Sequence, residues 1–243
     1  QIRIGLLVAE TVDPTAIAYS TSGGAIAVAL DRIRNESLLE GYEFKFFVRN
    51  CDCDPERTMG AFAEFIQLLG VHAVVGPPCG GLFSGTMSTA YSIPTFMWGY
   101  TFLAELANDA RFPYVSTITA TSLSLGYGFI KLAEYNQWDK IAILYTKDST
   151  KYCDNIIADA LTAINDPNTY QSSITYTAVL DESNNATYYS RMQGARERAR
   201  IIVLCLSSGP SKRRFFARAN QMGMTSNEYV YVLLSVKGIG FGE

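Results

Sequence analysis

Short apolar runs alternate with segments of helical periodicity from one end of the chain to the other. The apolar runs predict two sets of four strands, at residues 3–8, 43–48, 73–75 and 94–98, and at 140–145, 173–179, 200–206 and 229–234. The segments between them predict helices at 22–35, 55–69, 121–135, 151–165, 186–199 and 211–222. This alternation is typical of parallel sheets that are covered by helices on both faces.

The two sets of strands predict an α/β fold with two doubly wound parallel-sheet lobes. We expect residues 1–115 to form the first part of an N-terminal lobe, 116–236 a second lobe, and the glycine-rich residues 237–243 a flexible tail. The segment Phe112-Pro-Tyr-Val-Ser116 is expected to cross between the sheets. Four strands are few for such a sheet, so the first lobe is expected to be incomplete.

Two predicted helices have a clear apolar face. The spacing places Ile26, Leu30 and Ile33 on one side of the first helix. In helix 55–69 the same spacing aligns Met59, Phe62, Ile66 and Leu69. Pro55 suits the first turn of that helix, where its missing N–H leaves no bond unmade.

Composition excludes several classes of protein. The chain has 243 residues, 48% of them hydrophobic and 18% charged, which is typical of a folded globular protein. A net charge of −3 argues against a nucleic-acid partner. No run of about 18 apolar residues predicts a membrane span. The chain opens on a strand without a signal peptide, so we expect a mature or excised segment, with any membrane anchor outside it.

Cysteines and glycosylation motifs predict an oxidising, extracellular setting. Asn35-Glu-Ser37 and Asn185-Ala-Thr187 match the acceptor pattern for N-glycosylation. The chain has five cysteines, so one is free or pairs with another molecule. No metal site is predicted, because Cys51-Asp-Cys53 is too tightly spaced for the usual zinc ligands and His72 is the only histidine.

No catalytic residue is predicted, and no cofactor. His72 precedes a predicted strand and Cys79 follows it, so the two side chains would lie at opposite ends of that strand. The loop Gly76-Pro-Pro-Cys-Gly-Gly81 lacks the phosphate-binding glycine patterns and is predicted to be a strand-to-helix turn.

Ligands of open α/β sheets bind at the carboxyl ends of the strands. The residues predicted to face a ligand cleft are therefore Glu10, Thr11, Gly80, Gly81, Trp98, Tyr100, Thr119, Thr121 and Tyr145. The aromatic rings of Trp98 and Tyr100 could stack on a flat or peptidic ligand, although rings at strand ends also fill the interior.

Several motifs resemble one family over nearly the whole chain. They are Ala27-Val-Ala-Leu-Asp-Arg-Ile33, Cys53-Asp, Gly76-Pro-Pro-Cys79, Ile93-Pro-Thr-Phe-Met-Trp98, Arg111-Phe-Pro113, Trp138-Asp-Lys-Ile-Ala-Ile-Leu144 and Ile201-Ile-Val-Leu-Cys-Leu-Ser-Ser208. Together they resemble the receptor family ligand-binding region of type I periplasmic-binding-protein fold, in the branch of natriuretic-peptide receptors and receptor guanylate cyclases. The sequences Trp98-Gly and Arg111-Phe-Pro most resemble those of nematode receptor guanylate cyclases.

The resemblance implies an extracellular, non-catalytic sensor on the plasma membrane. Receptors of this kind are single-pass membrane proteins and homodimers, and they carry an intracellular guanylate cyclase domain that this chain lacks. The implied ligand is an unknown extracellular peptide or small molecule. An alternative is a small-molecule cleft binder related to amino-acid receptors or solute-binding proteins, and a third possibility is a secreted enzyme.

The resemblance also implies the pairing of the cysteines. It predicts disulfides Cys53–Cys79 and Cys153–Cys205, and leaves Cys51 as a free thiol, a substitute for Cys53, or an intermolecular partner. Natriuretic-type receptors bind chloride through the N–H groups of a Gly-Cys pair in the turn that contains Cys79. Because Pro78 has no N–H, chloride binding of that type is not expected here.

Overall fold

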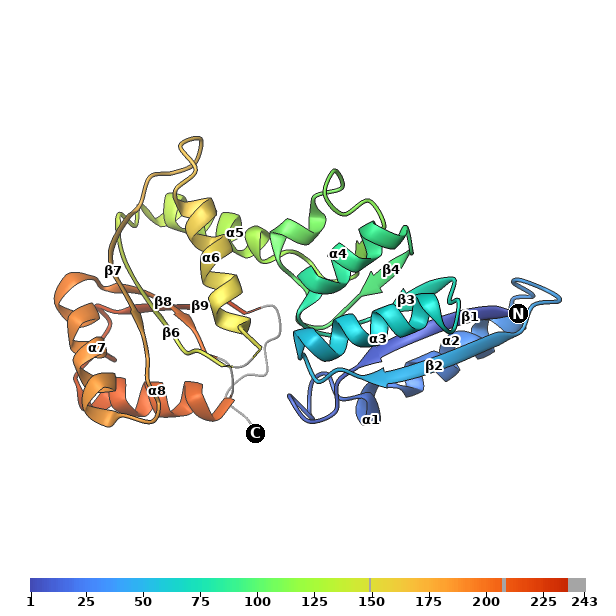
Figure 1. The fold of residues 1–243 in the computed structure, drawn as a ribbon. Coiled ribbons are helices and arrows are strands. Elements are labelled where there is room, and N and C mark those ends of the chain that lie inside the picture. The colour runs from blue at the N-terminus through green and yellow to red at the C-terminus, as the bar shows by residue number, and fades with distance from the viewer. Residues whose placement is uncertain (149, 207–208, 236–243) are drawn as a thin grey trace. The chain divides into compact units, whose positions relative to one another are not determined.

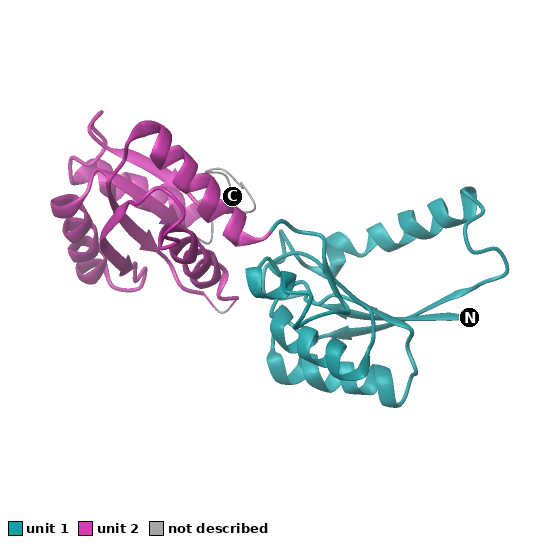
Figure 2. Cartoon of the chain, turned by 90° about the horizontal axis from the view of Figure 1, so that it is seen from above, with its two compact units in different colours: residues 1–120 teal, residues 121–243 magenta. Residues whose placement is uncertain are grey.

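The computed structural model describes residues 1–148, 150–206 and 209–235, and the chain divides into two compact units (Figure 2). Unit 1 comprises residues 1–120 and unit 2 residues 121–243. Each unit contains one sheet of parallel strands, as the sequence predicts. The expected tail at 237–243 lies outside the described residues. In the part of the chain that is described, no helix is both long and apolar enough to span a membrane.

The sheet of unit 1 has five strands in the order β2-β1-β3-β4-β5. These are β1 (Ile2–Val8), β2 (Phe44–Asn50), β3 (Ala73–Val75), β4 (Thr95–Met97) and β5 (Val115–Thr117). The prediction of four strands was wrong, because β5 pairs with β4 in the segment that was expected to cross between sheets. A three-residue strand is too short to produce a periodic signal. Unit 1, which includes β5, extends to residue 120.

The helices of unit 1 pack unequally on its two faces. Helices α3 (Pro55–Gln67) and α4 (Gly81–Tyr91) cover one face, where Phe62 and Phe65 pack with Leu7 and Val74. Asp54 caps α3 by accepting a hydrogen bond from the N–H of Arg57 at 2.8 Å.

The other face of this sheet is partly open. Helices α1 (Tyr19–Ser22) and α2 (Gly24–Asn35) lie on that side, and none of their residues is buried. On the same face Val48 and Phe96 remain 36% and 46% exposed. A short 3₁₀ helix, η1 (Ala104–Ala107), precedes β5.

Unit 2 is a four-stranded sheet between two pairs of helices (Figure 1). Its strands run in the order β7-β6-β8-β9 and comprise β6 (Lys140–Tyr145), β7 (Ser173–Val179), β8 (Ile201–Cys205) and β9 (Val230–Leu233). Helices α5 (Ser122–Asn136) and α6 (Tyr152–Ile164) lie against one face, and α7 (Asn185–Arg198) and α8 (Gly209–Gln221) against the other.

Both faces of the unit 2 sheet are buried. Ala142 and Leu144 pack with Tyr188 of α7 and Phe215 of α8. The alternate residues of β6, Ile141 and Ile143, are also fully buried, so β6 is apolar on both sides, as parallel strands usually are.

Each unit has one disulfide at the carboxyl edge of its sheet. Cys53 is joined to Cys79, with 5.3 Å between their Cα atoms, and Cys153 to Cys205, with 5.5 Å. These are the pairs that the family resemblance implies. Cys51 is a buried free thiol that donates to the carbonyl of Val8 at 3.1 Å, and burial raises its pKa.

We predict that each disulfide stabilises mainly its own unit. The bridges span 26 and 52 residues, so chain entropy predicts losses of about 3.5 and about 4 kcal/mol when they are removed. Replacing Cys153 and Cys205 by alanine should therefore lower the urea midpoint of unit 2. The two tryptophans report the units separately, because Trp98 lies in unit 1 and Trp138 in unit 2.

The measurement uses a Trp98→Phe background to follow unit 2 and a Trp138→Phe background to follow unit 1. The matched control replaces Cys53 and Cys79 by alanine, which should shift the Trp98 transition instead. Equal shifts of both transitions by either pair of substitutions would contradict independent stabilisation.

Candidate functional site

The loops after β1 and β2 meet around Asp52 at the carboxyl edge of the unit 1 sheet. Its Oδ1 atom accepts from the N–H of Glu10 at 2.7 Å and from that of Thr11 at 2.9 Å. Its Oδ2 atom accepts from the side-chain amide of Asn50 at 2.8 Å. Asp52, which sequence reasoning did not select, thus holds the backbone of the two adjacent candidates Glu10 and Thr11. The available signal was an aspartate two residues after the end of β2, between two cysteines.

The electrostatics of this edge keep its carboxylates ionised. Partial burial acts to raise the pKa of Asp52, but the N–H donors of Glu10 and Thr11 outweigh it and leave the pKa below its ordinary value. The pKa of Glu10 is lowered chiefly by hydrogen bonds from Ser20, whose N–H lies 3.1 Å from the Glu10 carboxylate. Both groups are negative at neutral pH, which favours donors or cations as ligand groups.

The glycines after β3 have different roles. Gly80 is exposed, has φ of +66° and forms the N-cap of α4. Gly81 is buried, and an added Cβ there would lie 2.8 Å from Leu106. Gly81 therefore allows close packing of α4, and only Gly80 stays available for close approach of a ligand.

The two aromatic candidates after β4, Trp98 and Tyr100, differ in their exposure. Tyr100 is 8% exposed and its hydroxyl donates to Asp13 at 2.5 Å, so its ring is a packing element. Trp98 is half-buried and lines an apolar cavity of about 270 Å³ with Ile26 and Ile118. Trp98 is thus the one of these two rings that could contact an apolar ligand group.

The remaining candidates lie near the junction between the units and in unit 2. Thr119 is half-buried, and its Oγ1 has no hydrogen-bond partner in the described structure. Thr121 is the N-cap residue of α5, and its Oγ1 lies 3.2 Å from Ser124 Oγ. Tyr145 ends β6 and is half-buried.

Unit 2 has a further pocket that sequence reasoning missed. It measures about 450 Å³ and lies at the carboxyl ends of β6 and β7, lined by Thr146, Lys147 and residues 179–183. Glu182 in this loop accepts from the hydroxyl of Ser211 at 2.9 Å and pairs with Arg214 at 3.1 Å. The signal in the sequence was the polar run Asp181-Glu-Ser183 two residues after the end of a predicted strand.

The arrangement offers no catalytic pair of His72 and Cys79. The Nδ1 atom of His72 accepts from the N–H of Arg3 at 3.0 Å, at the amino edge of the sheet, while Cys79 is held in a disulfide at the carboxyl edge. Within the described residues no three histidine, cysteine, aspartate or glutamate side chains are grouped as a metal site would require.

The turn after β3 differs from the chloride-binding turn of natriuretic-type receptors. Pro78 has no N–H to donate, and its carbonyl accepts from the N–H of Tyr100 at 2.7 Å. This turn therefore uses residue 78 to hold the loop after β4.

Comparison with known proteins identifies the family. The model of the receptor family ligand binding region matches residues 21–238. The chain is 32% identical over 99% of its length to receptor-type guanylate cyclase gcy-5 of Caenorhabditis elegans, and 32% identical over 99% to gcy-4 of Caenorhabditis briggsae. It is also 27% identical over 99% to gcy-14 of Caenorhabditis elegans.

The chain spans 22% of the length of each of these three relatives, so the comparison covers one region of longer proteins. The matched region includes most of unit 1 and all the described strands of unit 2. The chain therefore belongs to the receptor family ligand-binding regions.

Proposed function

We propose that this ligand-binding region is the extracellular sensor of a single-pass plasma-membrane receptor whose intracellular part is a guanylate cyclase. The observation that carries the proposal is the end-to-end alignment with receptor-type guanylate cyclases, which the chain matches over only 22% of their length. The region itself is the ligand-binding part and not the catalytic domain. Binding would shift a two-state arrangement of lobes or subunits, in a homodimer, and so regulate the cyclase.

The chemistry of the chain supports the extracellular assignment. Two disulfides close the carboxyl edges of the two sheets, and such bonds persist in oxidising compartments. Both predicted glycosylation acceptors, Asn35 and Asn185, are exposed. An unknown peptide or small molecule is the proposed ligand, with Glu10, Thr11, Gly80 and Trp98 as its candidate contacts in unit 1. The proposed contacts near or within unit 2 are Thr119, Thr121 and Tyr145.

The decisive experiment measures cyclic GMP. The full receptor, expressed in cells, is exposed to a panel of inorganic salts, free amino acids and short peptides. A responding probe should lose potency when Glu10→Gln or Trp98→Ala is introduced, whereas Tyr135→Ser, on an exposed helix surface, should respond as the wild type does. The secreted chain alone should produce no cyclic GMP from GTP with magnesium or manganese. Cyclic GMP made by the secreted chain would contradict the proposal, and so would an unchanged response after this region is deleted from the receptor.

Glycosylation of Asn35 and Asn185 is a second expected outcome. Asn35 ends α2 and Asn185 begins α7, so both side chains are reached from solvent. The Oδ1 atom of Asn185 accepts from Arg218 at 2.5 Å, which leaves its Nδ2 atom as the acceptor nitrogen. In a eukaryotic secretory host, Asn35→Gln and Asn185→Gln should each remove one glycan mass. A mass unchanged by glycosidase treatment would contradict the assignment of both sites.

We also propose that another part of the receptor covers the open face of the unit 1 sheet. Exposed Val48, Phe96 and Ile118 on this side, with a helix α2 that buries no residue, support this. A receptor segment longer by about 150 residues, the size of one more domain, should unfold at higher temperature. Trp98 lines the cavity on this face, so its emission should shift to shorter wavelength. An extended segment with the same emission and stability would contradict this completion of the lobe.

A further inference from the structure

Helix α2 ends in a backbone motif that normally contains glycine. The N–H of Ser37 donates to the carbonyl of Arg34 at 3.1 Å, and the N–H of Leu38 donates to that of Ile33 at 2.9 Å. These two bonds, with φ of +52° at Ser37, define a Schellman cap. The left-handed residue of such a cap is usually glycine, because a Cβ is strained in that conformation. The chain has serine there, and the ends of α4 and α5 likewise have Ser92 and Gln137 with positive φ.

Nothing in the local structure explains the serine. Among the described residues, the hydroxyl of Ser37 has no hydrogen-bond partner, and Ser37 is exposed. The hydroxyl is, however, the group that the sequence Asn35-Glu-Ser37 needs to accept an N-linked glycan. Ser37 thus completes the acceptor motif of Asn35 with a hydroxyl that makes no other described contact.

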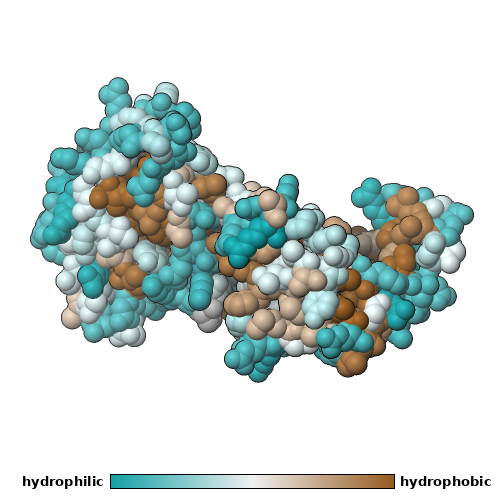
Figure 3. Space-filling model, turned by 45° about the horizontal axis from the view of Figure 1, so that its top comes forward, coloured by the Kyte–Doolittle hydropathy of each residue, from teal (hydrophilic) through white to brown (hydrophobic). Residues whose placement is uncertain are grey.

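The cap also folds an apolar segment back beside the glycosylation motif. Leu38, Leu39 and Tyr42 are 49%, 51% and 61% exposed. We refer to these three side chains as the loop patch. Figure 3 shows apolar surface on the outlying end of unit 1, where α2 and the loop to β2 lie. For a surface loop this is a concentrated group of large apolar side chains.

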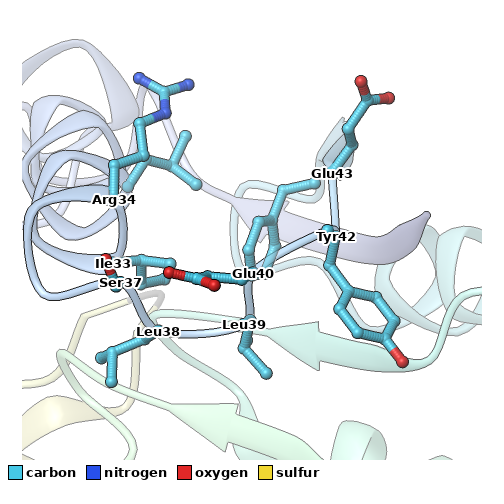
Figure 4. Close-up of a pocket in the computed structure, with 11 residues that line it drawn as sticks. Ile33, Arg34, Ser37, Leu38, Leu39, Glu40, Tyr42 and Glu43 are labelled. Atoms are coloured by element: carbon cyan, nitrogen blue, oxygen red, sulfur yellow. The ribbon is translucent and has the colours of Figure 1, made fainter.

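The loop patch borders a pocket of about 560 Å³ between the end of α2 and the start of β2. In the view of Figure 4, Leu38, Leu39 and Tyr42 lie along one side, and Arg34 and Glu43 extend from the other. Ser37 is a lining residue, whereas Asn35 is not, so a glycan would reach the patch from the rim. Leu38 lies at most about 11 Å along the chain from Asn35, a distance that the first two sugars of an N-linked glycan span.

We propose that the glycan on Asn35 lies over the loop patch and shields it from association with other apolar surfaces. This inference rests on the proposed glycosylation of Asn35. The sugar rings offer an apolar C–H face to Tyr42 and the leucines, while their hydroxyl groups stay in water or bond to Arg34 and Glu43. The occupant is the chain's own glycan; a second copy of the chain would take its place when the glycan is absent.

The second glycosylation site provides a matched control. Asn185 lies in the first turn of α7, where its side chain bonds to Arg218 and its neighbours Asn184 and Ser183 are polar and exposed. Among the described residues, none of the exposed large apolar side chains lies between 136 and 232, so a glycan at Asn185 has no such patch in the surrounding segment. Removing each glycan in turn therefore separates shielding of the loop patch from the general solubilising effect of a glycan.

The experiment compares four secreted variants with the wild type. Asn35→Gln removes the glycan, Ser37→Thr retains the motif, Asn185→Gln removes the control glycan, and a fourth combines Asn35→Gln with Leu38→Ser, Leu39→Asn and Tyr42→Ser. Intact mass gives glycan occupancy, and fluorescence of an apolar dye and light-scattering mass report exposure and self-association.

Asn35→Gln alone should increase dye fluorescence several-fold and make the mass rise with concentration. Ser37→Thr, Asn185→Gln and the fourth variant should behave as the wild type does. An Asn35 that carries no glycan would overturn both the glycosylation and the shielding. A glycosylated Asn35 whose removal changes dye binding and mass no more than Asn185→Gln does would overturn the shielding alone.

A comparison of Ser37→Gly with Asn35→Gln tests why serine is kept. Both lack the glycan, and glycine relieves the left-handed strain at residue 37, so Ser37→Gly should melt at a higher temperature. A lower melting temperature would show that Ser37 stabilises the cap, and the serine would then no longer support a glycan at Asn35.

Discussion

Parallel pairing at β1 and β6 determines where the loops of this fold meet. Each of these strands is flanked on both sides by parallel neighbours, β2 and β3 around β1, and β7 and β8 around β6. Parallel neighbours need a connection that returns along the sheet, and a helix packed on a face provides it. All the carboxyl ends then share one edge, and the loops at that edge combine residues that are distant in sequence. Asp52 and Glu10 meet for this reason, as do Cys153 and Cys205.

At the carboxyl edge the loops have little apolar packing of their own, and disulfides and hydrogen bonds hold them to one another. In unit 1, Asp52 holds the loop after β1, and the Cys53–Cys79 bond ties the loop after β2 to the turn after β3. The hydroxyl of Tyr100 then holds the loop after β4 against Asp13. Successive strand ends are thus linked by groups that donate, accept or bond covalently. A ligand region with fixed loops loses less conformational entropy on binding, which is consistent with a sensor whose contacts come from several loops.

The sequence predicted the strands of unit 2 well because they are apolar and separated by strong helical patterns. Prediction was weaker in unit 1, where β4 and β5 have three residues each and their pairing depends on contacts far along the chain. The predicted apolar face of α3 was also partly wrong, since Met59 is 37% exposed, and Phe65, which that face left out, is as fully buried as the predicted Phe62. Gly5 of β1 explains why the Phe65 ring is buried, because an added Cβ at Gly5 would lie 2.5 Å from that ring. The periodicity of a helix does not contain information about a small residue in the strand against which it packs.

The sequence predicted where the candidate site residues lie in the sheet, but not whether each side chain is buried or exposed. The rule that ligands bind at the carboxyl ends of strands selected Glu10, Gly81, Trp98 and Tyr100, and the structure has all four after the carboxyl ends of β1, β3 and β4. Whether each faces solvent or the interior depends on packing partners, such as Leu106 for Gly81 and Asp13 for Tyr100, that sequence spacing does not reveal.

Helix α2 shows the converse limit. Its row of Ile26, Leu30 and Ile33 was predicted from spacing, and the row does face two cavities, yet no residue of the helix is buried. The periodicity of a helix predicts that one face is apolar, but it does not predict which part of the protein packs on that face. The structure supplies the missing information at the end of the helix, where a strained serine and an exposed apolar turn stand next to a single asparagine. Under the proposal above, the glycan on Asn35 supplies the polar cover that the packing of this turn does not provide.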